Sequence, residues 1–196
     1  MRTMIVVGAL LLVGCGDDGG GARPDTLLAD TPASGHTVDG TVVEMGGTAP
    51  ATGEAIVLWV SDIGQGDFVY KWGQGTATAT TFNVDVVTPV PNDATFGGMV
   101  GVGTVALVPS GTSVPDGVVP DSTFNTALGY TGEYAIIYRP SASSAPASWV
   151  DAFPVGLACG KCVHQTSGLD TFMPVACSTV VLGVGPQSMT YTCNWT

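Results

Sequence analysis

The sequence predicts an all-β fold of about eight strands that packs as two sheets and has a disulfide-stapled C-terminal part. Three observations support this class. Short apolar runs rich in Val, Thr and aromatic residues alternate with turns that contain glycine or proline. No stretch has the length and 3.6-residue periodicity of a long amphipathic helix. Four of the five cysteines lie between residues 159 and 193.

The expected strands are short and are separated by turn residues. They are Thr37–Met45, Glu54–Ser61, Phe68–Trp72, Thr80–Val87, Met99–Val108 and Glu133–Arg139, with a final hairpin of Cys177–Val184 and Met189–Trp195. The fourth is the clearest, because Phe82, Val84 and Val86 alternate with polar residues. Strands spaced this closely favour an immunoglobulin-like β-sandwich over a barrel. A short helix is expected only over Asp121–Leu128, with Asp121 as its cap.

The charge balance excludes nucleic acid as a partner. Sixteen Asp and Glu residues stand against five Lys and Arg residues, which gives a net charge of −11. Such a surface repels both phosphate backbones and anionic lipid headgroups. Any attachment to a membrane must therefore be hydrophobic or covalent.

The first residues have the organisation of an export signal. Arg2 precedes the apolar run Met4–Val13, which is shorter than the roughly 20 residues that a membrane-spanning helix needs. The tetrapeptide Leu12-Val13-Gly14-Cys15 resembles the lipobox of bacterial lipoproteins. This resemblance implies that residues 1–14 are removed as a signal peptide and that Cys15 is the lipidation site. Its sulfur would carry a diacylglyceryl group and its new amine a fatty acid such as palmitate, and two or more chains anchor a protein stably where one does not.

The residue after the lipobox bears on the compartment. In bacterial lipoproteins an aspartate at this position marks retention at the inner membrane, and here Gly16 stands there instead. The resemblance therefore implies an outer-membrane lipoprotein, on the periplasmic or the surface-facing side. An ordinary cleavable signal followed by an incidental cysteine is the alternative.

Composition also sets the expected domain boundaries. Residues 15–35 are rich in glycine and charge, which predicts a flexible tether. Residues 36–196 form the β-sandwich domain, with a Ser/Ala/Pro-rich internal loop at 139–153 and a cysteine-bearing part at 154–196. The segments Val38–Val43 and Pro50–Leu58 resemble transthyretin-like and carboxypeptidase-regulatory-type modules of exported proteins, which implies the same sandwich fold.

The four C-terminal cysteines are expected to form two disulfides, because their number is even and the protein is predicted to be exported. They are Cys159, Cys162, Cys177 and Cys193. The sequence leaves all three pairings open. The first two match neither a c-type haem site, because Val163 precedes His164, nor a thioredoxin motif, because a strand-helix context is missing. A zinc site that recruits Cys177 or His164 is the remaining alternative, and no metal or cofactor is predicted.

Three other motifs have structural explanations. Gly101–Ala106 matches a dinucleotide-binding fingerprint, but Pro109 follows where a helix would be needed, so a strand is predicted. Asp62–Asp67 could form a weak calcium loop, although a hairpin turn accounts for it better. Asn194–Thr196 matches a glycosylation sequon, which is a chance match in a bacterial lipoprotein.

The residues predict a non-catalytic protein. The only histidines are His36 and His164, no Gly-x-Ser-x-Gly elbow is present, and no pair of acids stands out. We therefore expect a binding, interaction or structural module on a lipid-anchored protein, with its protein or glycan partner undefined. A carbohydrate- or small-ligand-binding protein is the first alternative and an envelope hydrolase the second.

The predicted strand Phe68–Trp72 can distinguish between these possibilities. The aromatic residues Phe68, Tyr70 and Trp72 share one face of it. The favoured interpretation is that they fill the core, with Val69 and Lys71 pointing outward. The carbohydrate-binding alternative requires Tyr70 and Trp72 to line an exposed groove.

Overall fold

The fold is known from a computed structural model that describes residues 36–60, 68–95, 100–120, 125–141, 148–166, 168–189 and 193. These residues belong to the unit Ala33–Thr196. They contain eleven strands and several 3₁₀-helices of three to five residues, so the all-β class is confirmed.

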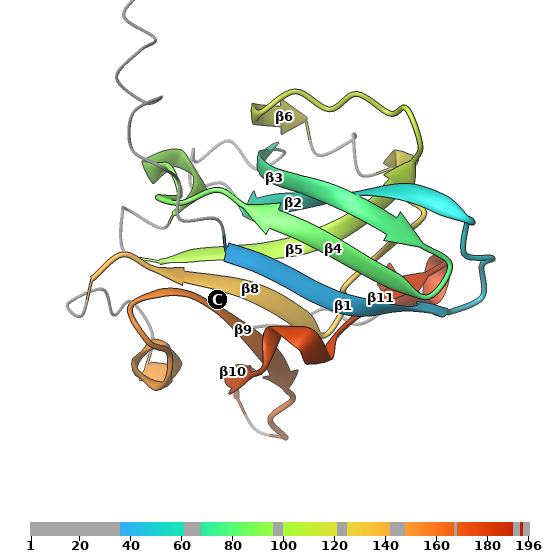
Figure 1. Ribbon diagram of the computed structural model, residues 1–196. Coiled ribbons are helices and arrows are strands. Elements are labelled where there is room, and N and C mark those ends of the chain that lie inside the picture. The colour runs from blue at the N-terminus through green and yellow to red at the C-terminus, as the bar shows by residue number, and fades with distance from the viewer. Residues whose placement is uncertain are drawn as a thin grey trace, which may run out of the picture. The chain divides into compact units, whose positions relative to one another are not determined.

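The strands carry the labels of Figure 1. They are β1 (His36–Glu44), β2 (Thr52–Val60), β3 (Phe68–Thr78), β4 (Thr81–Val86), β5 (Gly101–Pro109), β6 (Gly117–Pro120), β7 (Gly129–Tyr130), β8 (Tyr134–Arg139), β9 (Gly156–Val163), β10 (Thr171–Val175) and β11 (Val180–Val184). The 3₁₀-helices are η2 (Asn92–Ala94), η4 (Ser148–Ala152), η5 (Cys177–Thr179) and η6 (Pro186–Met189).

Seven strands close into a barrel. Their order is β5-β2-β3-β4-β1-β11-β7, and β7 pairs back to β5. Neighbours are antiparallel except β1 and β11, which are parallel. The expected immunoglobulin-like sandwich differs from this pairing, because a sandwich has two separate sheets whereas these strands form one continuous sheet. We call these seven closed strands the ring. Because the ring is closed, each of its strands pairs with a neighbour on both sides.

The sheet forks at β5. Residues Gly101–Gly103 of β5 pair with β8, whereas Ala106 and Leu107 pair with β7 on the same edge. At the fork the Thr131 hydroxyl lies 2.8 Å from the Thr104 hydroxyl and accepts a bond from the Val105 amide. Strands β8, β9 and β10 therefore extend the sheet beyond the ring, as the lower part of Figure 1 shows.

The ring encloses the central core. On its strands every second side chain points inward, as the alternating burial of β4 illustrates. The buried members on ring strands are Val38, Val42, Ala55, Val57, Trp59, Ala77, Phe82, Val84, Val86, Val105, Leu107, Val180, Leu182 and Val184. The predicted half-buried strand at Thr80–Val87 is thereby confirmed.

The largest side chain of this core depends on two glycines. Trp59 is fully buried, and its indole packs against Gly101 and Gly103 of β5. A Cβ atom on Gly103 would lie 2.9 Å from the Trp59 ring, closer than real Cβ contacts. The glycines of the fingerprint-like motif thus lie in a strand, as predicted, and make room for Trp59.

The outer face of β3 is buried as well, which corrects one prediction. Val69 and Lys71 do project from the face opposite Tyr70, but both are buried instead of exposed. The reason is β6, which pairs with β3, so that Val119 packs with Val69 in a second cluster. Lys71 donates to Asp116 (2.5 Å) and to Gln74 (2.9 Å), so its buried ammonium is paired.

The C-terminal half departs furthest from expectation. β11 pairs with β1 and β7, and Pro186–Met189 is a 3₁₀-helix, so the predicted hairpin around Gly185 is wrong for the described residues. β9 and β10 were not predicted.

The expected loop at 139–153 contains η4, which Arg139 holds by donating to the Phe153 carbonyl and the Asp151 carboxylate. Of the expected helix 121–128, residues 121–124 and its cap lie outside the described residues.

Candidate functional site

Two disulfides staple opposite faces of β9. Cys159 bonds to Cys177, and Cys162 bonds to Cys193. Because the two cysteines of β9 are three residues apart, their side chains leave opposite faces of the strand. Cys159 accordingly belongs to the central core, whereas Cys162 belongs to a separate cluster with Phe153. The predicted two disulfides are confirmed, and the open pairing is resolved.

This geometry excludes the two roles that a Cys-Gly-Lys-Cys sequence suggests, namely a redox-active pair and a zinc-binding pair. A redox-active or zinc-binding pair needs both sulfurs on one side of the chain. The alternative in which Cys159 and Cys162 jointly hold zinc is therefore wrong. The glycine between them has a packing role, because Gly160 lies beneath Phe153 and Phe172.

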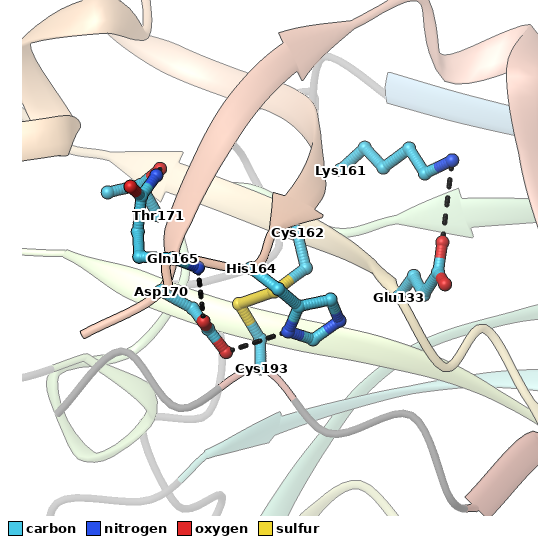
Figure 2. The surroundings of a disulfide bond; sticks show 8 residues. All are labelled: Glu133, Lys161, Cys162, His164, Gln165, Asp170, Thr171 and Cys193. Carbon is cyan, nitrogen blue, oxygen red and sulfur yellow. Dashed lines mark hydrogen bonds and ion pairs between the residues drawn. A yellow bond between two sulfur atoms is a disulfide. The ribbon is translucent and has the colours of Figure 1, made fainter. Parts of the chain in front are cut away.

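A histidine and a buried aspartate lie beside the second disulfide, as Figure 2 shows. The His164 Nδ1 atom is 3.0 Å from one carboxylate oxygen of Asp170. The other carboxylate oxygen accepts a hydrogen bond from the backbone N–H of Gln165 at 3.0 Å. The Asp170 side chain is only 10% exposed, whereas that of His164 is 53% exposed. The aspartate is therefore held in place by two donors at the end of β9. The other histidine, His36, is exposed at the start of β1.

The second candidate is a pocket at the fork of the sheet, which we call the tyrosine pocket. It has a volume of about 220 Å³ and is mostly apolar. Its lining comes from the β7–β8 segment, from β11 and from two flanking residues: Met45, Tyr130, Thr131, Gly132, Glu133, Tyr134, Val181, Gly183 and Ser188. Because β7 and β8 diverge from a common edge of β5, the chain between them leaves a hollow next to β11.

An ion pair borders the tyrosine pocket. Lys161 lies 3.4 Å from the Glu133 carboxylate, and its ammonium is 5.4 Å from the centre of the Tyr134 ring. Attraction by the Tyr134 phenol oxygen, followed by the hydrogen bond and charge of Glu133, raises the pKa of Lys161. The pocket edge thus offers a carboxylate acceptor, an ammonium donor and an aromatic face within one small area.

Only some residues of these two candidate sites could be predicted from the sequence. Tyr134 lies at the start of a strand that was predicted, where it alternates with Ile136 and Tyr138. Lys161 lies on β9, which was not predicted, so its approach to Glu133 could not be foreseen. Asp170 belongs to no motif at all.

The aromatic strand favours the core interpretation. Tyr70 and Trp72 are partly buried and pack against the central core, and their ring centres are 6.0 Å apart. The Trp59 indole donates to the Trp72 carbonyl at 3.2 Å, which ties the three residues together. Burial, and then the charges of Asp93 and Asp116, raise the pKa of Tyr70. Tyr70 and Trp72 are therefore partly buried against the core, whereas the carbohydrate-binding alternative requires them to line an exposed groove.

Several predicted sites lie outside the described residues. These are the signal peptide 1–14, the lipidation site Cys15, the tether 15–35, the acidic turn 62–67 and the sequon 194–196. The side chain of Phe68 also lies outside them. They remain predictions.

The fold and its sites define an all-β domain with a closed ring of strands, two disulfides and a small pocket at the fork of its sheet. Comparisons with protein-family models, with curated proteins and with solved structures found no match. In the described part of the chain, no helix combines the length and the hydrophobicity required to cross a bilayer.

Proposed function

We propose that this chain is a lipid-anchored protein of the bacterial outer membrane whose β domain is a non-catalytic binding module. The anchor is supported by the apolar leader, the lipobox-like Leu12–Cys15 and the glycine-rich tether that follows. The two disulfides support an oxidising compartment, because such bonds persist in exported proteins and are rare in the cytosol. The tether would let the domain reach beyond the lipid surface on either its periplasmic or its outer side.

The observation that carries the binding role is the tyrosine pocket. Small-ligand sites are typically concave and apolar with a few polar groups that orient the ligand. Met45 and Val181 supply the apolar lining, and Tyr130 and Tyr134 supply two aromatic side chains. Its volume lies below the roughly 300–1,000 Å³ of sites for drug-sized molecules, so its ligand is small.

The chemistry of the pocket edge favours an uncharged, hydroxyl-rich ligand such as a monosaccharide. A carboxylate and an ammonium side by side accept from and donate to neighbouring hydroxyl groups. The apolar face of a sugar ring packs on an aromatic ring in the manner of other aromatic contacts. A strongly charged ligand is disfavoured, because Glu133 and Lys161 already neutralise each other.

The test is titration of the domain with glucose, galactose and N-acetylglucosamine at millimolar concentrations. Methyl NMR signals of Met45 and Val181, both in the pocket, report occupancy. We expect at least one of these sugars to shift both signals, and Tyr134→Ala to weaken that binding at least tenfold, about 1.4 kcal/mol. Glu133→Gln keeps the size of the side chain and removes its charge, and we expect it to weaken binding in the same direction.

The matched control is Val118→Ala, which truncates an exposed residue of β6 and is expected to leave binding unchanged. The binding proposal fails if none of the three sugars moves the Met45 and Val181 signals, or if Tyr134→Ala binds as tightly as the unmodified protein.

A further inference from the structure

The second disulfide has a carboxylate at its side that the first one lacks. The sulfurs of Cys162 and Cys193 and a carboxylate oxygen of Asp170 all lie within 4.8 Å of one another. Among the residues that the structure describes, this is the only group of three or more such ligands; none includes Cys159 or Cys177. The geometry therefore distinguishes the two bridges.

The carboxylate is positioned independently of the disulfide. One carboxylate oxygen is hydrogen-bonded to the His164 ring and the other to the backbone N–H of Gln165, and the residue is 8% exposed. Figure 2 shows the carboxylate near both the imidazole and the disulfide. Opening the disulfide would leave Asp170 in place next to two thiols.

We propose that the Cys162–Cys193 disulfide covers a latent metal site, in which Cys162, Cys193 and Asp170 bind a zinc ion once a dithiol reductant has opened the bridge. This inference is independent of the tyrosine pocket and of the lipid anchor. His164 acts as a positioning residue that orients the carboxylate, as outer-shell partners of metal ligands commonly do.

Charge explains why the opened site takes a divalent cation. Two thiolates and one carboxylate in a partly buried cluster carry three negative charges, and burying such charges without a partner is costly. A zinc ion leaves a net charge of −1 and accepts two sulfurs and one oxygen as ligands, with a water in the fourth position.

The chemical balance is simple. The dithiol reductant gives two electrons and two protons to the disulfide, so that its own sulfurs join and Cys162 and Cys193 become thiols. Zinc then displaces the two thiol protons to solvent. The metal links the same two chain positions as the disulfide did, so it replaces the covalent staple.

The experiment measures the thermal unfolding midpoint of the full-length protein with and without zinc, under anaerobic conditions after removal of the reductant. For the reduced protein we expect zinc at about 100 times its Kd to raise Tm by roughly 5–10 °C. The oxidised protein is expected to show no shift. Cobalt replaces zinc in a parallel titration, in which a thiolate-to-cobalt charge-transfer band reports sulfur ligation.

Variants assign the ligands. Cys159→Ala/Cys177→Ala is expected to keep the zinc response after reduction, whereas Cys162→Ala/Cys193→Ala is expected to lose it. Asp170→Asn is expected to weaken cobalt binding at least tenfold, and the oxidised form of this variant shows by its own Tm whether it folds. The proposal is overturned if zinc leaves the Tm of the reduced protein unchanged, if Cys162→Ala/Cys193→Ala responds equally, or if folded Asp170→Asn binds cobalt as tightly.

Discussion

Trp59→Ala is expected to lower the free energy of unfolding by about 3–5 kcal/mol. Trp59 is fully buried inside the ring, with its indole against Gly101 and Gly103 and its nitrogen bonded to the Trp72 carbonyl. Truncation removes this apolar surface and leaves a large cavity, because glycines offer no side chain that could fill it. Typical domains have a free energy of unfolding of only about 5–15 kcal/mol, so this one substitution would remove a large part of the stability of the domain. Urea denaturation followed by circular dichroism measures it.

Val60→Ala is the matched control, since Val60 is the next residue of β2 and is 43% exposed. This variant is expected to lose less than about 0.5 kcal/mol in free energy of unfolding, as most surface substitutions do. A Trp59→Ala variant that loses less than about 1 kcal/mol would contradict a ring packed around this residue.

Removing either disulfide is expected to cost about 3–4 kcal/mol. The bridges close sequence separations of 18 and 31 residues, and they restrict the unfolded chain by similar amounts. We expect Cys159→Ala/Cys177→Ala and Cys162→Ala/Cys193→Ala to show comparable losses, the second slightly larger because its loop is longer. Chemical denaturation of each oxidised variant gives the two values.

Each double variant serves as the control for the other, because each removes one disulfide and keeps the disulfide on the opposite face of β9. A variant that lacks all four cysteines is the further control, and a reductant is expected to leave its stability unchanged. An unmodified protein whose unfolding midpoint does not respond to reductant would show that the bridges contribute nothing.

Local patterns in the sequence predict the strand content of this domain well. Phe82, Val84 and Val86 alternate with polar residues and form β4 as expected. The proline at 109 predicts a strand, and not a helix, for the glycines at 101 and 103, and β5 ends at that proline. Both predictions depend on neighbours within a few residues, where steric and solvation effects decide the conformation.

The arrangement of the strands could not be predicted in the same way. Closure of the ring depends on β1 pairing in parallel with β11, for example Val42 opposite Leu182, across most of the domain. Burial of Lys71 depends on β6 and on Asp116, which are distant in sequence. The contact of Lys161 with Glu133 likewise joins β9 to the turn before β8. Alternation along one strand contains no information about which strand lies next to it.

Disulfide partners illustrate the same limit. The number and location of the cysteines predict two bridges, but three pairings satisfy that count. Once Cys159 and Cys162 are known to lie in one strand, their odd spacing directs them to opposite faces and excludes a bond between them. The choice between the two remaining pairings depends on which face Cys177 and Cys193 approach, and this is set by contacts distant in sequence. β9 has no clear strand signal, because Gly160 interrupts its apolar pattern.

The most direct test of the lipid anchor is mass analysis of the N-terminal peptide of the protein isolated from membranes of a bacterial host. We predict a peptide that begins at Cys15 and carries a diacylglyceryl group and an amide-linked fatty acid, and we predict that Cys15→Ala abolishes this modification and membrane retention. A mature protein that is recovered from the soluble fraction with an unmodified residue 15 would contradict lipid anchoring.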